Sequence, residues 1–137
     1  MWTLSVATQR RVVFVDITSE VADLVRGCGD GLVVVYVPHT TAGITINENA
    51  DPSVRVDIET TLERLVPPGL PFTHREGNAD AHVKASLMGS SVTVPVRGGA
   101  MQLGTWQGIY FAEFDGPRHR HVHVSFTATA QAAPPAQ

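Results

Sequence analysis

Polar side chains crowd the stretch "PHTTAGITINENAD", which runs from Pro38 to Asp51. It follows a run of apolar residues and leads into a segment that resembles the start of a helix. Buried polar groups are energetically unfavourable unless they are paired, so this concentration beside a strand indicates either an energetically unfavourable turn or a functional site. His39 comes directly after the apolar strand, and a strand end is a rigid mount for such a side chain.

Three histidines, His39, His74 and His82, form a candidate metal-binding set. Neutral imidazole nitrogens bind Zn²⁺ and similar divalent ions, and three of them leave coordination positions open for water or substrate. The spacing of His74 and His82 matches no standard signature, so the set requires that the fold bring the strand end to the helix. The plainer alternative is that each histidine is structural.

Lys84, Gln107 and Glu113 are further candidates for chemistry. Lys84 follows His82 by two residues, so on a helix the two side chains diverge by about 200°. Lys84 therefore serves either an adjoining edge of the site, a neighbouring subunit or solvent. In a strand that starts near Gln107, Gln107 and Glu113 share a face and flank an apolar centre, which is typical of a pocket wall.

The segment "RHRHVHV" contains a second group of histidines, His119, His121 and His123. Because strand side chains alternate between faces, an extended strand projects all three to one side, which is a possible metal-ligand geometry. Val122 and Val124 alternate on the opposite face. A half-buried strand with a solvated outer surface is therefore a sufficient explanation, and it is the interpretation favoured here.

The composition is that of one compact globular domain. The chain has 137 residues, is 43% hydrophobic and has a formal net charge of −3, which argues against the large basic surface that nucleic-acid binding requires. The single cysteine, Cys28, rules out an internal disulfide. No stretch approaches the roughly 20 apolar residues of a membrane span, and the N-terminus lacks the pattern of a signal peptide. These features predict a cytoplasmic protein without a membrane partner.

Hydrophobic spacing predicts an α+β fold, a mostly antiparallel sheet system with two or three helices in a single domain. Asp51 and Pro52 have the order of a helix cap and a first-turn proline. Thr18 or Ser19 is expected to cap one helix and Asn78 another. Segments 3–8, 12–17, 32–37, 43–47 and 92–96, together with strands through residues 101–103, 109–111 and 122–126, are expected strands. The run 32–37, apolar on both faces, is expected to be a central buried strand. The domain is expected over 1–127 and an Ala/Pro/Gln-rich flexible tail over 128–137.

Three stretches together resemble one family. They read "HTTAGITINENADPSVRVD", "HREGNADAHVKASLMGSSVTVPV" and "MQLGTWQGIYFAEFDGPR". They are similar to the motifs of the YjbQ-like family, often labelled secondary thiamine-phosphate synthase, and the resemblance covers roughly residues 5–126. It implies a compact α+β sandwich that assembles as a homotrimer, with sites near subunit boundaries.

The resemblance also implies a histidine-lined, metal-capable pocket, with the opening stretch as one wall. His39, His74 and His82 match the family's motif histidines and become the expected metal ligands. Lys84, Gln107 and Glu113 match other polar motif positions and become the expected catalytic residues. The expected substrate-binding residues are Thr40, Thr41, Asn47, Glu48, Asn49 and Arg118.

The family label implies the coupling of a hydroxymethylpyrimidine diphosphate to a thiazole phosphate, with release of diphosphate. A divalent cation with Lys or Arg would neutralise the departing diphosphate. The chain lacks an obvious carboxylate cluster for Mg²⁺, and three histidines favour Zn²⁺ instead. The expectation is a metal-assisted enzyme that acts on a small anionic or phosphorylated metabolite. The alternatives are a non-catalytic trimeric metal- or metabolite-binding protein and a metal-free structural trimer.

Overall fold

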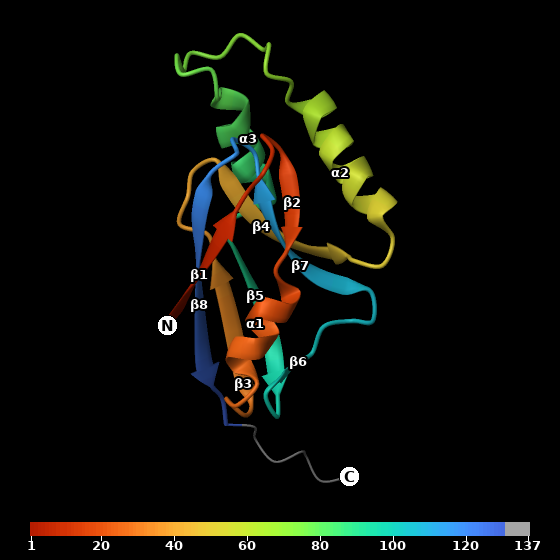
Figure 1. Cartoon of the computed structure of the whole chain (residues 1–137), viewed down its shortest axis with the longest axis vertical. Coiled ribbons are helices and arrows are strands. Elements are labelled where there is room, and N and C mark those ends of the chain that lie inside the picture. Colours follow the sequence, from red (N-terminus) through yellow and green to blue (C-terminus); the bar gives the residue numbers. More distant parts are fainter. Residues whose placement is uncertain (131–137) are drawn as a thin grey trace.

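The fold consists of eight strands and three helices among residues 1–130, which are the residues that the computed structural model describes (Figure 1). In chain order the elements are β1 (Trp2–Ala7), β2 (Val13–Asp16), α1 (Thr18–Val25), β3 (Gly31–Tyr36), β4 (Ala42–Glu48), α2 (Pro52–Leu65), α3 (Ala79–Met88), β5 (Ser91–Arg97), β6 (Ala100–Met101), β7 (Gln107–Glu113) and β8 (His119–Ala128).

The strands form two antiparallel sheets. The five-stranded sheet has the order β1-β8-β3-β5-β6, and the three-stranded sheet has the order β2-β7-β4. Every described pair of neighbouring strands is antiparallel. The α+β class, the two antiparallel sheets and the single domain that the sequence predicts are confirmed.

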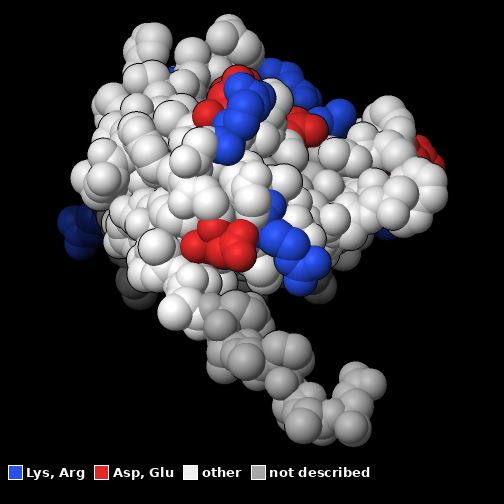
Figure 2. All heavy atoms as spheres, turned by 90° about the horizontal axis from the view of Figure 1, so that it is seen from below, with Lys and Arg blue, Asp and Glu red and all other residues white. Residues whose placement is uncertain are grey.

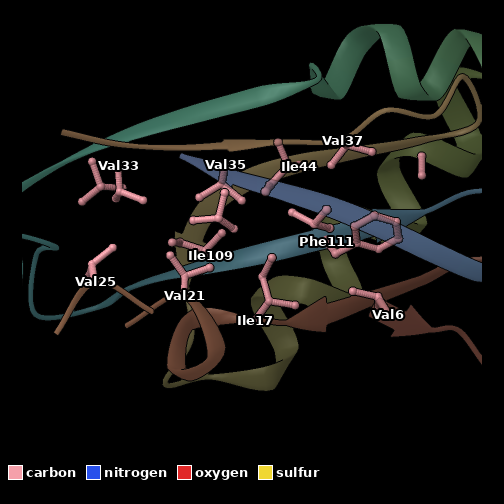
Figure 3. Packing of buried hydrophobic residues seen from close by; sticks show 14 of the residues in the cluster. Val6, Ile17, Val21, Val25, Val33, Val35, Val37, Ile44, Ile109 and Phe111 are labelled. Carbon is pink, nitrogen blue, oxygen red and sulfur yellow. The ribbon is translucent and has the colours of Figure 1, made fainter. Parts of the chain in front are cut away.

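The main core lies between the two sheets (Figure 3). Val33 and Val35 of β3 point inward from the larger sheet, and Ile109 and Phe111 of β7 point inward from the smaller one. Helix α1 closes this core with Val21 and its neighbours. Because alternate residues of each strand face the core, the alternating valines of the sequence account for this layer.

A second, smaller core lies on the other face of the three-stranded sheet. Phe14 and Phe114 meet there edge to face, with ring centroids 6.1 Å apart, and pack with the small residues of α3. Helix α2 contributes Ile58 and Leu62 to this layer but has no buried residue of its own. In Figure 1, α2 stands apart from the strands, joined to α3 by a long loop. The three-stranded sheet is therefore covered on both faces.

The helix starts agree with the sequence only in part. Asp51 caps α2 as predicted, because its carboxylate accepts a hydrogen bond from the Ser53 N–H at 2.9 Å. The predicted cap of α1 at Thr18 or Ser19 is wrong: the helix begins at Thr18, whose N–H donates to the Asp16 carboxylate. Asn78 occupies the cap position of α3 without a side-chain cap bond, and its amide donates to Asp115 instead.

Strand β3 departs from the expectation of burial on both faces. It is central in its sheet, between β8 and β5, and Val33 and Val35 are fully buried. Leu32 and Tyr36 on the opposite face are 39% and 45% exposed. No helix among residues 1–130 covers that face, since α1, α2 and α3 all pack on the inner layers. One face of an apolar strand is thus open.

At the C-terminal end, strand β8 continues to Ala128, and the Thr129 N–H donates to the Asp30 carbonyl. These two residues are the first of the expected tail, whose boundary stays a prediction. The rest of that tail, residues 131–137, lies outside the described residues. The search of the described helices finds none that is long and apolar enough to cross a membrane. On the end of the molecule that Figure 2 shows, acidic and basic side chains are interspersed and form no continuous basic surface.

Candidate functional site

A cavity of about 520 Å³ lies where β3 ends and α3 runs past it. His39 and Thr40 line it from the segment after β3, and His82 and Ser86 line it from α3. Ser90 completes the polar lining, and its carbonyl accepts the Val37 N–H at 2.8 Å, which ties the end of β3 to the end of α3. Two of the three predicted histidines therefore share one cavity.

Glycine at position 43 lets α3 approach β4 closely enough to form this cavity. A Cβ at Gly43 would lie 2.7 Å from the Gly89 carbonyl oxygen and 3.0 Å from the Met88 Cβ, both at the end of α3. The same contact carries a hydrogen bond, because the Ile44 N–H donates to the Gly89 carbonyl at 3.0 Å. Gly43 therefore helps to set the position of His82 relative to His39.

His74 lies beside His82. Their ring centroids are 5.1 Å apart and the rings are nearly perpendicular. His74 comes from the loop before α3, where its Nε2 is 3.8 Å from a carboxylate oxygen of Glu76. The structure thus brings the third predicted histidine beside His82, although His74 is not among the residues that line the cavity.

His39 is held by a backbone hydrogen bond. The His121 N–H donates to its Nε2 at 2.9 Å, and the rings of the two histidines stack with centroids 6.4 Å apart. Burial, followed by the positive charge of nearby Arg120, lowers the pKa of His39 below its ordinary value. A neutral imidazole that accepts at Nε2 carries its proton on Nδ1, so His39 in this position presents an N–H donor.

These geometries fit a metal only in part. His74 and His82 are adjacent and offer imidazole nitrogens, the ligands that Zn²⁺ prefers. His39 joins them as a ligand only if its ring turns over or leaves the His121 N–H. Within residues 1–130, no group of three or more His, Cys, Asp or Glu side chains already stands in a metal-holding arrangement. A single chain therefore supplies two candidate metal ligands, His74 and His82, and one hydrogen-bond donor, His39.

Glu113 is fully buried in an ion pair with Arg120, away from the cavity lining. Arg120 donates to both carboxylate oxygens of Glu113 and to the Thr41 hydroxyl, and Thr8 donates to Glu113 at 2.8 Å. Burial opposes ionisation of Glu113, but the hydrogen bonds from Arg120, the Asp115 N–H and Thr8 outweigh it, so its pKa is lowered. The carboxylate is held charged, and its predicted catalytic role stays a prediction.

Sequence reasoning missed Arg120. The residue sits inside "RHRHVHV", where the outward histidines draw attention. The alternation of the strand places it on the same face as Val122 and Val124, and it is only 5% exposed. A buried arginine requires a buried carboxylate partner, which is the signal that could have revealed the ion pair.

Lys84 is buried on another side of α3 from His82. Its ammonium group donates to Asp80 at 3.0 Å and to Glu63 of α2, and Asp80 in turn accepts from Arg11 at 2.9 Å. Lys84 and Asp80 are each 1% exposed. The sequence left open whether Lys84 serves an edge of the site, a neighbouring subunit or solvent. Its burial rules out solvent. It ties α2 to α3, and it does not line the cavity.

The remaining predicted residues lie elsewhere. Asn47, Glu48 and Asn49 are at the end of β4 that is farther along the chain from His39, and a strand of 7 residues is about 20 Å long. Gln107 is opposite Glu48 in the register and accepts the Gly104 N–H. Arg118 is in the loop before β8 and pairs with Asp115. The structure therefore separates the histidines from the polar residues at the far end of β4, and it places Lys84, Glu113 and Arg118 in ion pairs outside the cavity lining.

Fold and cavity together define a class of α+β protein with two antiparallel sheets and a histidine-lined cavity. A sequence model of the family described as "UPF0047 protein YjbQ-like" matches residues 2–129. The chain is 54% identical over 121 residues to the UPF0047 protein MJ1081 of Methanocaldococcus jannaschii, which covers 87% of this chain and 88% of that relative. It is 47% identical over 125 residues to the UPF0047 protein YugU of Bacillus subtilis, with 89% and 95% covered.

A solved structure shows the same fold. It is an uncharacterised conserved protein of the YjbQ/UPF0047 family from Clostridium acetobutylicum, with a TM-score of 0.90 and 51% sequence identity over 93% of this chain and 100% of that chain. The chain therefore belongs to the YjbQ-like UPF0047 family, as the three motifs indicate. The names of these relatives state a family and no reaction.

Proposed function

We propose that this protein is a metal-assisted enzyme that acts on a small phosphorylated metabolite. The observation that carries the proposal is the convergence of His39 and His82 on one cavity, with His74 in contact with His82. A cavity of about 520 Å³ is large enough for a metabolite of this size. Its polar lining comes from imidazole and hydroxyl groups, which suits an anionic ligand that also meets a cation.

The proposed cofactor is a divalent metal, with Zn²⁺ favoured over Mg²⁺. Nitrogen ligands suit Zn²⁺, whereas Mg²⁺ requires oxygen ligands, and the cavity lining contains no carboxylate. When bound, such an ion would supply positive charge for the phosphate oxygens of the ligand. His74 and His82 would hold it, since their rings lie side by side. His39 Nδ1–H and the hydroxyls of Thr40 and Ser86 would then donate to the ligand.

The candidate reaction is the synthesis of thiamine phosphate. In this reaction the bond between the pyrimidine methylene carbon and the diphosphate oxygen breaks, and the thiazole nitrogen forms a new bond to that carbon. The diphosphate leaves with the electron pair, so donors around its oxygens stabilise the transition state. His39 is suited to this role because its lowered pKa keeps the ring neutral and its Nδ1 protonated at neutral pH.

We also propose that the active form is a homotrimer whose copies complete one another's sites. The cluster of Asn47, Glu48, Asn49 and Gln107 lies at the far end of β4 from the cavity of its own chain. In an assembly, this cluster can approach the cavity of a neighbouring copy. This arrangement would explain why one chain presents the predicted residues in two groups.

One observation favours a second candidate, a non-catalytic protein that binds a metal or metabolite. Lys84 and Glu113, the charged residues expected to take part in catalysis, are both buried in ion pairs. Neither lines the cavity. The cavity of one chain therefore offers binding groups but no free carboxylate or amine.

Metal content and turnover on purified, untagged protein test the proposal. Elemental mass spectrometry is expected to find near-stoichiometric metal in the wild type, and little in His82→Ala. The matched control is His119→Ala, an exposed histidine on β8 that should keep its metal. Equal metal in wild type and His82→Ala would refute the metal site. Diphosphate release from the two thiamine precursors distinguishes the enzyme from the binding protein.

A further inference from the structure

A second cavity, of about 630 Å³, lies between α2 and the loop that joins β1 to β2. The loop lines it with Arg10 and Arg11, and one face of α2 lines it with Glu59, Glu63 and Arg64. This arginine cavity shares no lining residue with the histidine cavity. The function proposed above therefore leaves it without a role.

Arg11 is held at one nitrogen and open at the others. Its Nη2 donates to the two carboxylate oxygens of Asp80, at 2.9 and 3.1 Å. The Asp80 side chain is 1% exposed, whereas that of Arg11 is 39% exposed. A guanidinium has five N–H donors, and within residues 1–130 those on Nε and Nη1 of Arg11 form no hydrogen bond. A buried carboxylate thus fixes a guanidinium whose remaining donors are available at the cavity wall.

Arg10 and Arg64 bring further positive charge to the cavity from its two sides, the loop and the helix. Both residues are exposed, and neither forms an ion pair with any residue in the part of the chain that the structure describes. Like charges that share a cavity repel one another, and an anion between them removes the repulsion. The two arginines therefore favour an anionic ligand.

The carboxylates at the cavity do not neutralise these two arginines. Glu63 accepts from the ammonium group of Lys84, and Asp80 accepts from both Lys84 and Arg11. This network has two positive and two negative groups, so its charges cancel. Outside the network, the two exposed arginines share the cavity with the single carboxylate of Glu59, which leaves one positive charge in excess.

We propose that the arginine cavity binds the phosphate group of a small metabolite. One guanidinium satisfies a carboxylate by meeting its two oxygens as a fork, whereas a phosphate has three acceptor oxygens that can take donors from several directions. The cavity supplies guanidinium groups from the loop and from α2. Its volume leaves room for the rest of a small molecule. The site is independent of the metal and of the reaction proposed for the histidine cavity.

A bound phosphate would also hold α2 in place. Helix α2 has no buried residue, and it contacts the described chain through Ile58, Leu62 and the pair of Glu63 with Lys84. Elements with so little burial open locally at a small cost in free energy. A phosphate between Arg10 and Arg64 adds a link between the loop and the helix, so it should slow amide hydrogen exchange in α2.

NMR titration of the full chain with inorganic phosphate, at about 0.15 M salt to screen non-specific attraction, tests the site. Arg10→Gln and Arg64→Gln each remove one exposed cation and leave the buried network intact. Each should raise the Kd for phosphate by about ten-fold or more, because a hydrogen bond to a charged group is lost. Glu59→Gln should lower the Kd, because it removes the carboxylate that repels the ligand.

The matched control is Arg97→Gln, which removes an equally exposed arginine at the end of β5. In Figure 1 the hairpin of β5 and β6 is at the bottom, whereas α2 is at the upper right. This variant should bind phosphate as the wild type does. Circular dichroism verifies that every variant is folded, and hydrogen exchange measured with and without phosphate should show protection over residues 52–65 in the wild type.

Four results would overturn the proposal. They are a wild type that binds no phosphate, a Kd that is unchanged in both Arg10→Gln and Arg64→Gln, acetate that binds as tightly as phosphate, and bound phosphate that leaves exchange in α2 unchanged. The same titration of His82→Ala separates the two cavities. Phosphate binding that is lost in His82→Ala would belong to the histidine cavity, whereas binding that is retained there belongs to the arginine cavity even if the metal site proves wrong.

Discussion

Replacing Arg120 with methionine should destabilise the protein more than any exposed arginine change. The substitution removes three hydrogen bonds, two to the carboxylate of Glu113 and one to the hydroxyl of Thr41. Glu113 is 0% exposed, so its charge is left without a cationic partner inside the protein, and only the Thr8 hydroxyl and the Asp115 N–H still donate to it. Breaking a buried pair in this way costs about 3–5 kcal/mol.

The magnitude translates into a large thermal shift. A domain of this size loses about 3–4 °C of Tm per kcal/mol, so Arg120→Met should lower Tm by about 10–20 °C. The matched control is Arg118→Met, two residues away, where the ion pair with Asp115 has an arginine side chain that is 53% exposed. Exposed pairs contribute about 1 kcal/mol or less, so this control should shift Tm by only a few degrees.

The pH dependence supplies an independent check. The pKa of Glu113 is lowered in the folded protein, so its ion pair stabilises the fold above the ordinary glutamate pKa of about 4.3. That stabilisation is lost as the pH falls through the folded pKa. In Arg120→Met the buried carboxylate binds a proton readily, and the stability gap to the wild type should therefore narrow as the pH falls toward 4.

Urea unfolding followed by circular dichroism at several pH values, at one protein concentration, measures these differences. The reasoning would be refuted if Arg120→Met were as stable as Arg118→Met at pH 7. It would also be refuted by a stability gap that is independent of pH, because loss of packing alone has no titrating group.

Three other results are expected. Lys84→Met should lower the free energy of unfolding by about 3–5 kcal/mol. The reason is that it leaves the buried Asp80 with Arg11 as its remaining cationic partner. A change in the free energy of unfolding below about 1 kcal/mol, measured by chemical denaturation, would contradict this expectation. Gly43→Ala should lower the free energy of unfolding by about 1–3 kcal/mol and weaken metal retention, because the added Cβ would lie 2.7 Å from a backbone oxygen. Gly69→Ala, whose added Cβ would have nothing within 4 Å, is the control in the denaturation and the metal-content measurements. NMR titration should place the imidazole of His39 below the usual pKa of about 6.5, since burial and Arg120 both disfavour its charged form, and an ordinary value would show that the ring is solvated.

Much of the fold could be predicted because its signals are local. Alternating valines in β5 and β8 indicate which side of each strand is buried, and the Asp51-Pro52 pair marks a helix start within one turn. The convergence of His39 and His82 was predictable only through the family resemblance. The sequence separation of His39 and His82 does not predict that the end of β3 lies next to α3.

The division of the site could not be predicted for the same reason. The stretch from His39 to Asn49 looks like one wall when it is read as a sequence. A strand, however, extends by about 3.3 Å per residue, so its two ends are far apart once β4 forms. A polar cluster in sequence becomes two polar clusters in space.

The sequence by itself determined the class of fold, the family and the buried face of the strands whose residues alternate, because alternation and motifs depend on neighbours along the chain. Tertiary structure alone decided the partners of the charged groups. Lys84 with Glu63, and Thr41 with Arg120, are separated by 21 and 79 residues and meet only through the packing of sheets and helices. Beyond the short separations of a helical turn, a charge has no preferred sequence separation for its partner, so the fold determines which distant groups are held in pairs.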